Sequence, residues 1–303
     1  MYGVQIPELV PGTPDWCRTA SASKIAGMLG HSAYQSPYSV WHTMAGHVGP
    51  EPDNATFRRG HYLEPSIASW FADEFPGYLV EPGGCWAHPD HMDRVASPDR
   101  MLTTHPDNLA TLEPALLELK SSGEFDHWGK TGTDEIPDGY KVQVLYQMWV
   151  TGCRVGYVAA ILPYLEFRWY RIDWDQAAID YIVASVDAFL DTLPGRPNEH
   201  EPDLDESEAT VAAVQRRYMN VEKGEEVEVT ETIAAEYLAA CDAVKAADGA
   251  KRKASAALLA AMGDKGTATC DGVKIANRQR RGEGVPYLVK ARNTNSNSDK
   301  KAA

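Results

Sequence analysis

The stretches RVASPDRM, residues 94–101, and LLELKSS, residues 116–122, decide how this chain folds. The first places an acid, Asp99, directly after a Ser-Pro turn, and the second is an apolar run that presents Glu118 and Lys120. Residues two apart in an extended chain project from the same face of a strand. The two stretches therefore predict strands, or strand ends, that are separated by a loop and carry these three side chains.

Two carboxylates beside a lysine suit chemistry on phosphate esters. Mg²⁺ prefers oxygen ligands, and Asp99, Glu118 and the backbone carbonyl of Leu119 can hold the ion while water and a substrate phosphate complete its shell. Lys120 would then place a positive charge beside the attacking water or the scissile phosphate. The alternative to a metal site is an ordinary Glu-Lys pair at the surface of a strand edge. The tripeptide Glu-Leu-Lys, residues 118–120, favours this alternative when it is taken alone.

Length and composition limit the class of protein. A chain of 303 residues can form one large domain or a core domain with an appendage. Its five cysteines are far apart and form no CxxC pair, which argues against a zinc ribbon or a disulfide framework. The N-terminus lacks a basic segment followed by an apolar core, and no apolar run approaches the roughly 20 residues that span a bilayer. We expect a soluble protein of the reducing cytoplasm.

Charge is distributed unevenly along the chain. The formal net charge of -14 argues against a simple polycation that coats nucleic acid. Residues 251–303 nevertheless contain twelve Lys and Arg against four Asp and Glu, so the acidic excess lies in residues 1–250. That excess is either a solubilising surface or includes carboxylates clustered for divalent cations. The bases of the tail either contact phosphates or belong to a solvated segment.

Helical spacing recurs before the two deciding stretches. Residues 21–30 predict a short helix that ends at Gly30. Residues 58–75 predict a longer helix with apolar residues at spacings of three and four. Because proline is tolerated only in the first turn of a regular helix, Pro65 predicts that this helix begins near Glu64.

Mixed periodicity continues after the two deciding stretches. Residues 140–152 return to helical spacing, and β-rich runs follow over residues 156–164 and 167–174. The order of helices, strands, helix and strands predicts an α/β or α+β domain over residues 1–194.

The remainder of the chain differs in composition. Residues 195–229 are rich in Pro, Gly and acids and predict a linker. Thr230 is placed to cap a long Ala-rich helix that Gly263 would end. A hairpin is expected over residues 267–279, and the polar end of the 230–303 segment is expected to be disordered. The apolar residues of the long helix follow a three-four spacing: Ile233, Tyr237, Ala240, Val244, Ala247, Ala254 and Leu258.

Taken together, these strings resemble the YqaJ-type viral recombinase and lambda-exonuclease family of PD-(D/E)XK nucleases. The strings WCRTASAS, SKIAGMLG, RRGHYLEPSIASWF, ASPDRM, LELKSS and YKVQVLYQMWVTG occur in the order of that family, over roughly residues 15–175. The resemblance implies a restriction-endonuclease-like mixed sheet flanked by helices. It covers the acidic linker and the C-terminal segment only weakly, although helical extensions occur in such proteins.

The resemblance also implies roles for individual residues. Asp99 and Glu118 match the metal ligands, and Lys120 matches the residue that positions the nucleophilic water. Gln143 matches a polar helix residue that faces the site, with a hydrogen-bonded glutamine at the core edge as the alternative. Glu64 matches a helix-borne acid that helps hold a second metal or its waters, or is a carboxylate favoured by a helix N-terminus.

Residues for binding DNA follow from the same resemblance. Ser23 matches a family serine, and Arg18 matches an arginine that reaches a 5′ phosphate, for which a forked guanidinium is well suited. Arg58 and Arg59 are further candidates for phosphate contacts, or belong to a solvated helix surface. Arg100 stands where the family usually has glycine, and either removes a tight turn or adds a DNA contact.

The expected activity is that of a Mg²⁺-dependent, or Mn²⁺-dependent, DNA exonuclease that degrades linear duplexes from 5′ to 3′ in phage-type recombination. The resemblance implies a single-strand annealing protein as partner, a homo-oligomer such as a trimeric ring, and action in the host cytoplasm if the gene is a phage gene. The alternatives are a non-catalytic DNA-binding or scaffold protein and a structure-specific endonuclease. A CRISPR-type end-processing nuclease is disfavoured, because such proteins usually carry an iron-sulfur cysteine cluster.

One further group has the composition of a metal site. His88, His91 and Asp93 lie within six residues of one another and include two residue types that bind zinc. They lack a fourth ligand at suitable spacing, so the sequence favours a polar loop.

Overall fold

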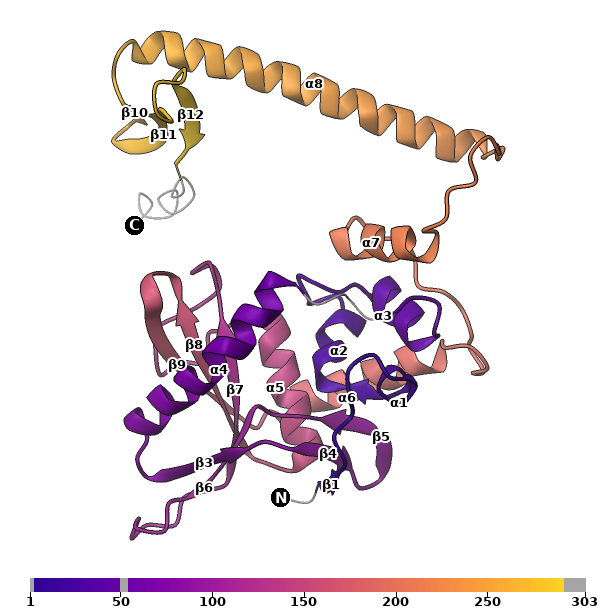
Figure 1. Ribbon diagram of the computed structural model, residues 1–303, viewed down its shortest axis with the longest axis vertical. Coiled ribbons are helices and arrows are strands. Elements are labelled where there is room, and N and C mark those ends of the chain that lie inside the picture. The colour runs from indigo at the N-terminus through magenta and orange to yellow at the C-terminus, as the bar shows by residue number, and fades with distance from the viewer. Residues whose placement is uncertain (1–2, 50–53, 292–303) are drawn as a thin grey trace. The chain divides into compact units, whose positions relative to one another are not determined.

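The computed structural model describes residues 3–49 and 54–291 and divides into two compact units, Met1–Val221 and Glu222–Ala303 (Figure 1). The first unit contains two sheets and seven α-helices among its described residues, and the second contains a long helix and a three-stranded sheet. The polar end that was expected to be disordered lies outside the described residues beyond residue 291.

A five-stranded mixed sheet forms the centre of the first unit, in the order β3-β6-β7-β8-β9. Strands β7 and β8 run parallel, and the other neighbours are antiparallel. A parallel pair needs a crossover connection, which helix α5 (Asp138–Thr151) supplies. The expected mixed sheet flanked by helices is therefore confirmed. The strands are β3 (Tyr78–Pro82), β6 (Arg100–Thr104), β7 (Ala115–Ser121), β8 (Val155–Leu162) and β9 (Glu166–Asp173).

The side chains of β7 alternate between two helical layers. Leu117 and Leu119 pack with helix α4 (Ala55–Glu74) on one face of the sheet. Leu116 packs with α5 on the other face, and Glu118 points to this same face because the side-chain period of a strand is two. Figure 1 shows α4 and α5 on either side of the sheet. The alternation thus separates an apolar side of β7 from a side that carries polar groups.

Helix α4 begins earlier than the sequence indicated. Asn54 caps it by accepting hydrogen bonds from the N–H groups of Thr56 and Phe57, and the helix then runs through Pro65. The prediction of a start near Glu64 was wrong. Proline removes one intrahelical hydrogen bond, but the buried face that includes Phe71 holds the helix against the sheet and offsets this loss.

A smaller sheet, in the order β1-β4-β5-β2, packs beside α5. The hydroxyl of Tyr146 on α5 donates to the carbonyl of Ala20 at 3.0 Å. The guanidinium of Arg94 donates to Asp187 at 2.7 Å and links the small sheet to helix α6. The elements are β1 (Val4–Ile6), β2 (Ala20–Ser21), β4 (Cys85–His88), β5 (His91–Ala96), α1 (Pro14–Arg18), α2 (Ala22–Met28), α3 (Pro37–Met44) and α6 (Gln176–Asp191).

A helix lies inside the segment expected to be a linker over residues 195–229. Helix α7 (Glu208–Arg217) is capped by Ser207 and packs on α3. The buried hydroxyl of Thr210 donates to Ser36 Oγ at 2.6 Å. The linker composition therefore describes the connections on both sides of α7, whereas α7 itself belongs to the first compact unit.

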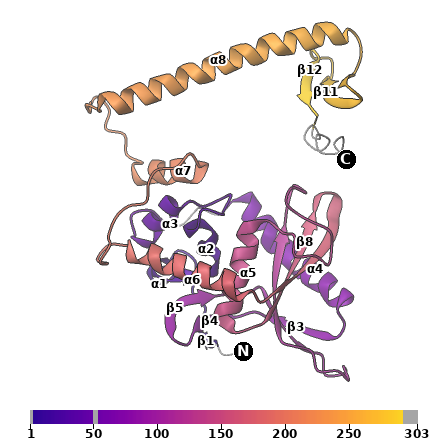
Figure 2. The same cartoon turned by 180° about the vertical axis from the view of Figure 1, so that it is seen from behind.

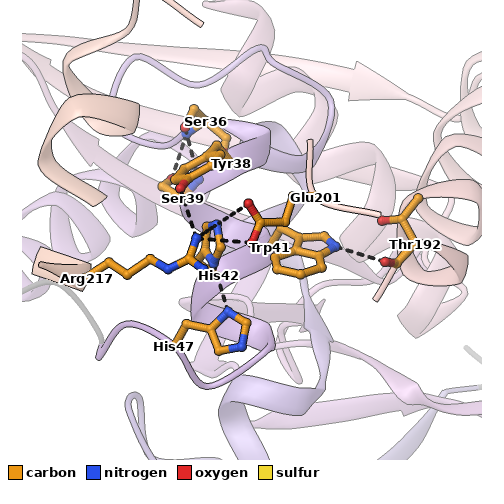
Figure 3. A network of polar contacts seen from close by, with 9 residues as sticks. All are labelled: Ser36, Tyr38, Ser39, Trp41, His42, His47, Thr192, Glu201 and Arg217. Carbon is orange, nitrogen blue, oxygen red and sulfur yellow. Dashed lines mark hydrogen bonds and ion pairs between the residues drawn. The ribbon is translucent and has the colours of Figure 1, made fainter. Parts of the chain in front are cut away.

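A polar network around His42 also joins α7 to α3 (Figure 3). The side chain of His42 is fully buried, and Arg217 of α7 lies 3.3 Å from its Nε2 and 3.1 Å from Glu201 Oε1. Because arginine can only donate, Nε2 of His42 is the acceptor and its proton is on Nδ1. This Nδ1–H donates to His47 Nδ1 at 2.9 Å. The network thus fixes a neutral tautomer of His42.

The second unit begins with helix α8 (Glu231–Met262), which Thr230 caps and Gly263 ends, as the sequence predicted. The expected hairpin is also present, formed by β10 (Thr267–Cys270) and β11 (Val273–Gln279), and β12 (Tyr287–Lys290) adds a third antiparallel strand. Among the described residues, no helix is both long and apolar enough to cross a membrane.

Candidate active site

Strand β7 places Glu118 and Lys120 side by side. Glu118 is only 3% exposed, and Lys120 Nζ donates to its Oε1 at 2.5 Å. The ammonium also lies 4.9 Å from the ring centroid of Tyr140, within range of a cation–π interaction. A buried carboxylate requires such partners, because burial without them strongly disfavours its charge.

Two glutamines one turn apart on α5 complete the surroundings of Glu118. Gln143 Nε2 donates to Oε1 at 2.6 Å, and Gln147 Nε2 donates to Oε2 at 2.8 Å. Three donors, including Lys120, therefore hold the two oxygens of Glu118. The Oε1 atom of Gln147 is buried and has no hydrogen-bond partner in the described part of the chain. Buried polar atoms are rarely left in this state.

Asp99 reaches the same place from the loop between β5 and β6. Its Oδ2 accepts a hydrogen bond of 2.6 Å from the backbone N–H of Leu119. Strand β6 pairs with β7 only as far as Arg100 opposite Leu117, so β7 extends past its neighbour at this edge. The N–H and C=O of one strand residue point to the same side, and the carbonyl of Leu119 therefore faces the edge that Asp99 occupies.

A glycine in the β3–β4 connection fixes the turn that carries Asp99. The N–H of Gly83 donates to the Asp99 carbonyl at 3.2 Å, and Arg100 Nη1 donates to the same carbonyl at 2.6 Å. A Cβ atom at residue 83 would lie 1.7 Å from the carbonyl oxygen of Pro98, and no side-chain atom can approach a backbone oxygen this closely. Arg100, which stands where the family usually has glycine, is a regular strand residue that supports the turn.

The electrostatics of the site follow from burial and close carboxylates. Burial, together with the charge of Glu118, raises the pKa of Asp99 to about 8, although Lys120 and the Leu119 N–H oppose the shift. Burial alone would lower the pKa of Lys120, but the charges of Glu118 and Asp99 prevail and raise it above its usual value. Lys120 is therefore a cation at neutral pH.

Glu64 lies on α4 and is partly exposed, with Oε1 3.2 Å from His61 Nδ1. Its charge contributes to the raised pKa of Asp99, so the two acids are electrostatic neighbours. Within residues 3–49 and 54–291, no three His, Cys, Asp or Glu side chains are grouped closely enough to hold a metal ion. The structure thus brings together Asp99, Glu118, Lys120 and Gln143, and leaves Glu64 outside their immediate contacts.

The candidates for DNA binding lie on helix ends at the surface. Arg18 is exposed at the end of α1, and Ser23 is exposed in the first turn of α2, with its hydroxyl 3.2 Å from that of Ser21. Arg58 and Arg59 are exposed near the beginning of α4. These four residues lie on α1, α2 and α4, whereas the carboxylates of Asp99 and Glu118 come from the β5–β6 loop and β7.

Sequence reasoning missed Lys24, which supports the helix that carries Arg18. Lys24 is buried, donates to the carbonyls of Trp16 and Thr19, and lies 3.8 Å from the centroid of the Trp16 ring. Its ammonium therefore adds a donor to carbonyls at the end of α1, where the carbonyl of Trp16 also accepts from the N–H and the hydroxyl of Thr19. Burial lowers the pKa of Lys24 to about 7. The string SASK offered no signal for this contact, because it depends on the packing of α1 on α2.

The histidines considered for zinc lie in the β4–β5 hairpin. His88 is buried, and its ring stacks on Trp149 with centroids 4.1 Å apart. His91 lies 5.3 Å from His88 between centroids. In the described part of the chain, these side chains do not form a group of three that could hold a metal ion.

Comparison with known families adds to this geometry. Residues 16–154 match the family model described as the YqaJ-like viral recombinase domain. Over these residues the chain is similar to the YqaJ-like viral recombinase domain. The resemblance stated from the sequence is thereby confirmed. The matched residues of the YqaJ-like domain include Asp99, Glu118, Lys120 and Gln143.

Some of the solved structures that are similar to this chain are named as exonucleases. The alkaline exonuclease LHK-Exo from Laribacter hongkongensis, also solved in complex with dAMP, is 24% identical, with TM-scores of 0.45 and 0.46; 57% of this chain and 87% of that chain are covered. A phage-related exonuclease from Haemophilus somnus 129PT is 15% identical, with a TM-score of 0.39; 57% and 92% are covered. No curated protein matches the chain.

Proposed function

We propose that this protein is a divalent-metal-dependent deoxyribonuclease that degrades linear duplex DNA from its ends, in the 5′ to 3′ direction, during phage-type recombination. One observation carries the proposal. Asp99, Glu118 and Lys120, from a loop and a strand, meet at one edge of β7, where Gln143 and Gln147 hold the glutamate. The match to a viral recombinase family supports the same activity.

The donor set fits Mg²⁺, and Mn²⁺ is an alternative with the same oxygen chemistry. Asp99, Glu118 and the carbonyl of Leu119 are hard oxygen donors at one strand edge, and Glu64 is the candidate for an additional outer contact. The buried Oε1 of Gln147, which has no hydrogen-bond partner in the described part of the chain, could accept a hydrogen bond from a water molecule in this site. When bound, the ion would lower the pKa of water and stabilise the charge of a phosphoryl group.

The protein's own residues would perform the other steps. Lys120, protonated at neutral pH, would orient the attacking water and stabilise negative charge on the scissile phosphate. Gln143 and Gln147 would keep Glu118 in one orientation, which limits the reorganisation that the reaction requires. Since Lys120 is mostly buried and contacts Glu118 directly, its position is set before DNA binds.

Contacts with DNA are proposed for the arginines and serine of the helix ends. Arg18 and Ser23 would bind a terminal 5′ phosphate, and Arg58 and Arg59 would contact the backbone. The 5′ to 3′ polarity, the single-strand annealing partner and action in the cytoplasm rest on the family resemblance. A homo-oligomer, such as a trimeric ring, would help an acidic chain handle DNA by presenting local positive charge.

The test uses linear duplexes labelled at one end, with and without a 5′ phosphate, in Mg²⁺. We expect the wild type to release nucleotides from the 5′ end, and Lys120→Met to lose about 100-fold to 1000-fold in rate. The matched control is Lys141→Met, which removes an exposed lysine of α5 that pairs with Asp134. It should retain the rate of the wild type.

Other outcomes distinguish the alternatives. Cleavage of circular duplexes as fast as linear ones would show an endonuclease and contradict the exonuclease assignment. Tight binding of duplex DNA by a folded wild type that releases no nucleotides in Mg²⁺ or Mn²⁺ would identify a DNA-binding scaffold.

A further inference from the structure

Helix α8 has an apolar face that its own unit does not cover. The helix has 32 residues, about 48 Å at 1.5 Å per residue. Met262 is its only buried residue, and within the second unit β10 packs near this C-terminal end. Ile233, Tyr237 and Val244 are 57%, 69% and 64% exposed. Large apolar side chains in a regular array at this exposure indicate a surface that pairs with another protein segment.

The array has the period of a coiled coil. Its positions alternate between spacings of four and three over the length of α8. A strict repeat of 3.5 residues makes a helix wrap around a partner helix with the left-handed twist of a coiled coil. We call these positions the α8 seam: Ile233, Tyr237, Ala240, Val244, Ala247, Lys251, Ala254, Leu258 and Ala261.

Charge along α8 identifies the partner as a second copy of the same helix. Residues 231–246 carry three acids and one lysine, whereas residues 247–262 carry one acid and three bases. Two copies in antiparallel orientation place the acidic half of each against the basic half of the other. This arrangement is attractive where residues 251–253 of one copy approach the acids of the other, and it steers the pairing.

Lys251 excludes the parallel alternative. It is the one charged residue of the α8 seam. Parallel helices would place it directly against the Lys251 of the partner, and like charges in one buried layer repel. In the antiparallel arrangement, residues in the first half of one seam lie opposite residues in the second half of the partner's seam. Lys251 therefore faces a small residue of the partner helix, such as Ala240 or Ala247. There its long stem can extend toward solvent.

We propose that α8 mediates self-association of this protein by forming an antiparallel two-stranded coiled coil with α8 of a second copy. The inference is independent of the nuclease assignment, because it uses no residue of the first unit. It has a structural consequence, because the two first units would be attached at opposite ends of a rod about 48 Å long. Each pair would carry two candidate active sites.

Sedimentation equilibrium of the full chain tests the proposal. The seam variant Ala254→Glu/Ala261→Glu places two charges in the pairing face, at positions that do not face Lys251 of the partner helix. The control Ala235→Glu/Ala256→Glu makes the same two changes on the opposite face of α8. Charge and helix propensity change equally in both, and circular dichroism would verify the helix content.

We expect the wild type and the control to contain an even number of chains, and the seam variant to contain half that number. Unpaired charges in the seam should weaken association at least about 100-fold. The proposal is overturned if the wild type contains a single chain, or if the seam variant associates as tightly as the control.

Carbodiimide cross-linking of mixed isotopically light and heavy chains tests the orientation. An antiparallel pair should give cross-links between Asp242 of one copy and Lys251 or Lys253 of the other. Cross-links between copies that join the same end of α8, such as Asp264 of one copy to Lys265 of the other just after the helix, would show a parallel pair. Cross-links from α8 only to the first unit of its own chain would show that another surface covers the seam. Either result contradicts the proposal.

Discussion

The carboxyl group of Asp99 is buried beside Glu118, and its charge is costly unless a cation compensates it. Burial and that neighbour raise the pKa of Asp99 from 3.8 to about 8. Between pH 3.8 and about pH 8, the folded chain without metal therefore binds more protons than the unfolded chain. It follows that Asp99 lowers the free energy of unfolding as pH rises from 3.8 through about 8. This unfavourable burial supports the proposed role of Asp99 in binding a cation.

We expect Asp99→Asn to stabilise the metal-free protein at pH 8 by on the order of 1 kcal/mol. The amide removes the buried charge, and its oxygen can still accept from the N–H of Leu119. Urea unfolding at pH 7 and pH 9 would measure the change. Mg²⁺ should raise the midpoint of the wild type but not of this variant. Asp203→Asn, an exposed change of the same kind, is the control. Equal stability of the three proteins at both pH values would contradict this account.

His42 gives a pH dependence of opposite sign. Burial and the charge of Arg217 lower the pKa of His42 below 6.5, although Glu201 opposes the shift. Below pH 6.5 the unfolded chain gains a proton that the folded chain resists, so stability is lost as pH falls from 6.5 through the folded pKa. The loss reaches at most about 1.4 kcal/mol per pH unit.

Comparison of the wild type with His42→Phe between pH 7 and pH 5 isolates this contribution. The variant should be less stable at pH 7, because Arg217 and His47 lose a partner, and the difference should shrink toward pH 5. His61→Phe, which alters an exposed histidine, should leave the pH dependence of the wild type intact. A difference that stays constant with pH would mean that His42 does not resist protonation.

At the scale of elements, the turn before β6 depends on a contact with the β3–β4 connection. We expect Gly83→Ala to displace Pro98 and with it Asp99, because the added methyl group would lie 1.7 Å from a backbone oxygen. The variant should lose Mg²⁺ binding by calorimetry and about 1 to 3 kcal/mol of stability. Gly266→Ala, where an added Cβ meets nothing within 4 Å, is the control. Mg²⁺ binding by Gly83→Ala that equals the wild type would show that the turn can move without consequence.

The sequence predicted elements well where local patterns determine them. The alternation along β7 places Glu118 and Lys120 on one face, and the helix at residues 140–152 brings Gln143 to them. The beginning of α4 could not be predicted, because burial against the sheet outweighs the helix-breaking tendency of Pro65. Packing between distant segments was also beyond the sequence. Gly83 meets Pro98 through the pairing of strands, and α7 docks on α3 from within an acidic segment.

At the scale of the whole molecule, every residue of the candidate site lies in the first compact unit. We therefore expect a protein truncated after Val221 to fold and to keep the nuclease rate of the full chain on short linear duplexes within about threefold. It should contain fewer chains than the full protein, because α8 is removed. Calorimetric unfolding and the labelled-duplex assay measure the two properties. A truncated protein that unfolds without a cooperative transition would show that the second unit stabilises the first.

Strand β6 begins only at Arg100, opposite Leu117 of β7, and this has a consequence for how such sites arise. Had β6 begun two residues earlier, with an N–H at position 98 where Pro98 has none, regular pairing would have satisfied the peptide groups of Leu119 and closed that border of the sheet. The shorter strand leaves one backbone donor for a carboxylate and one backbone acceptor that need not serve the sheet. The proposed reactivity at this position thus depends on incomplete secondary structure, and we expect an insertion that extends β6 along β7 to abolish it.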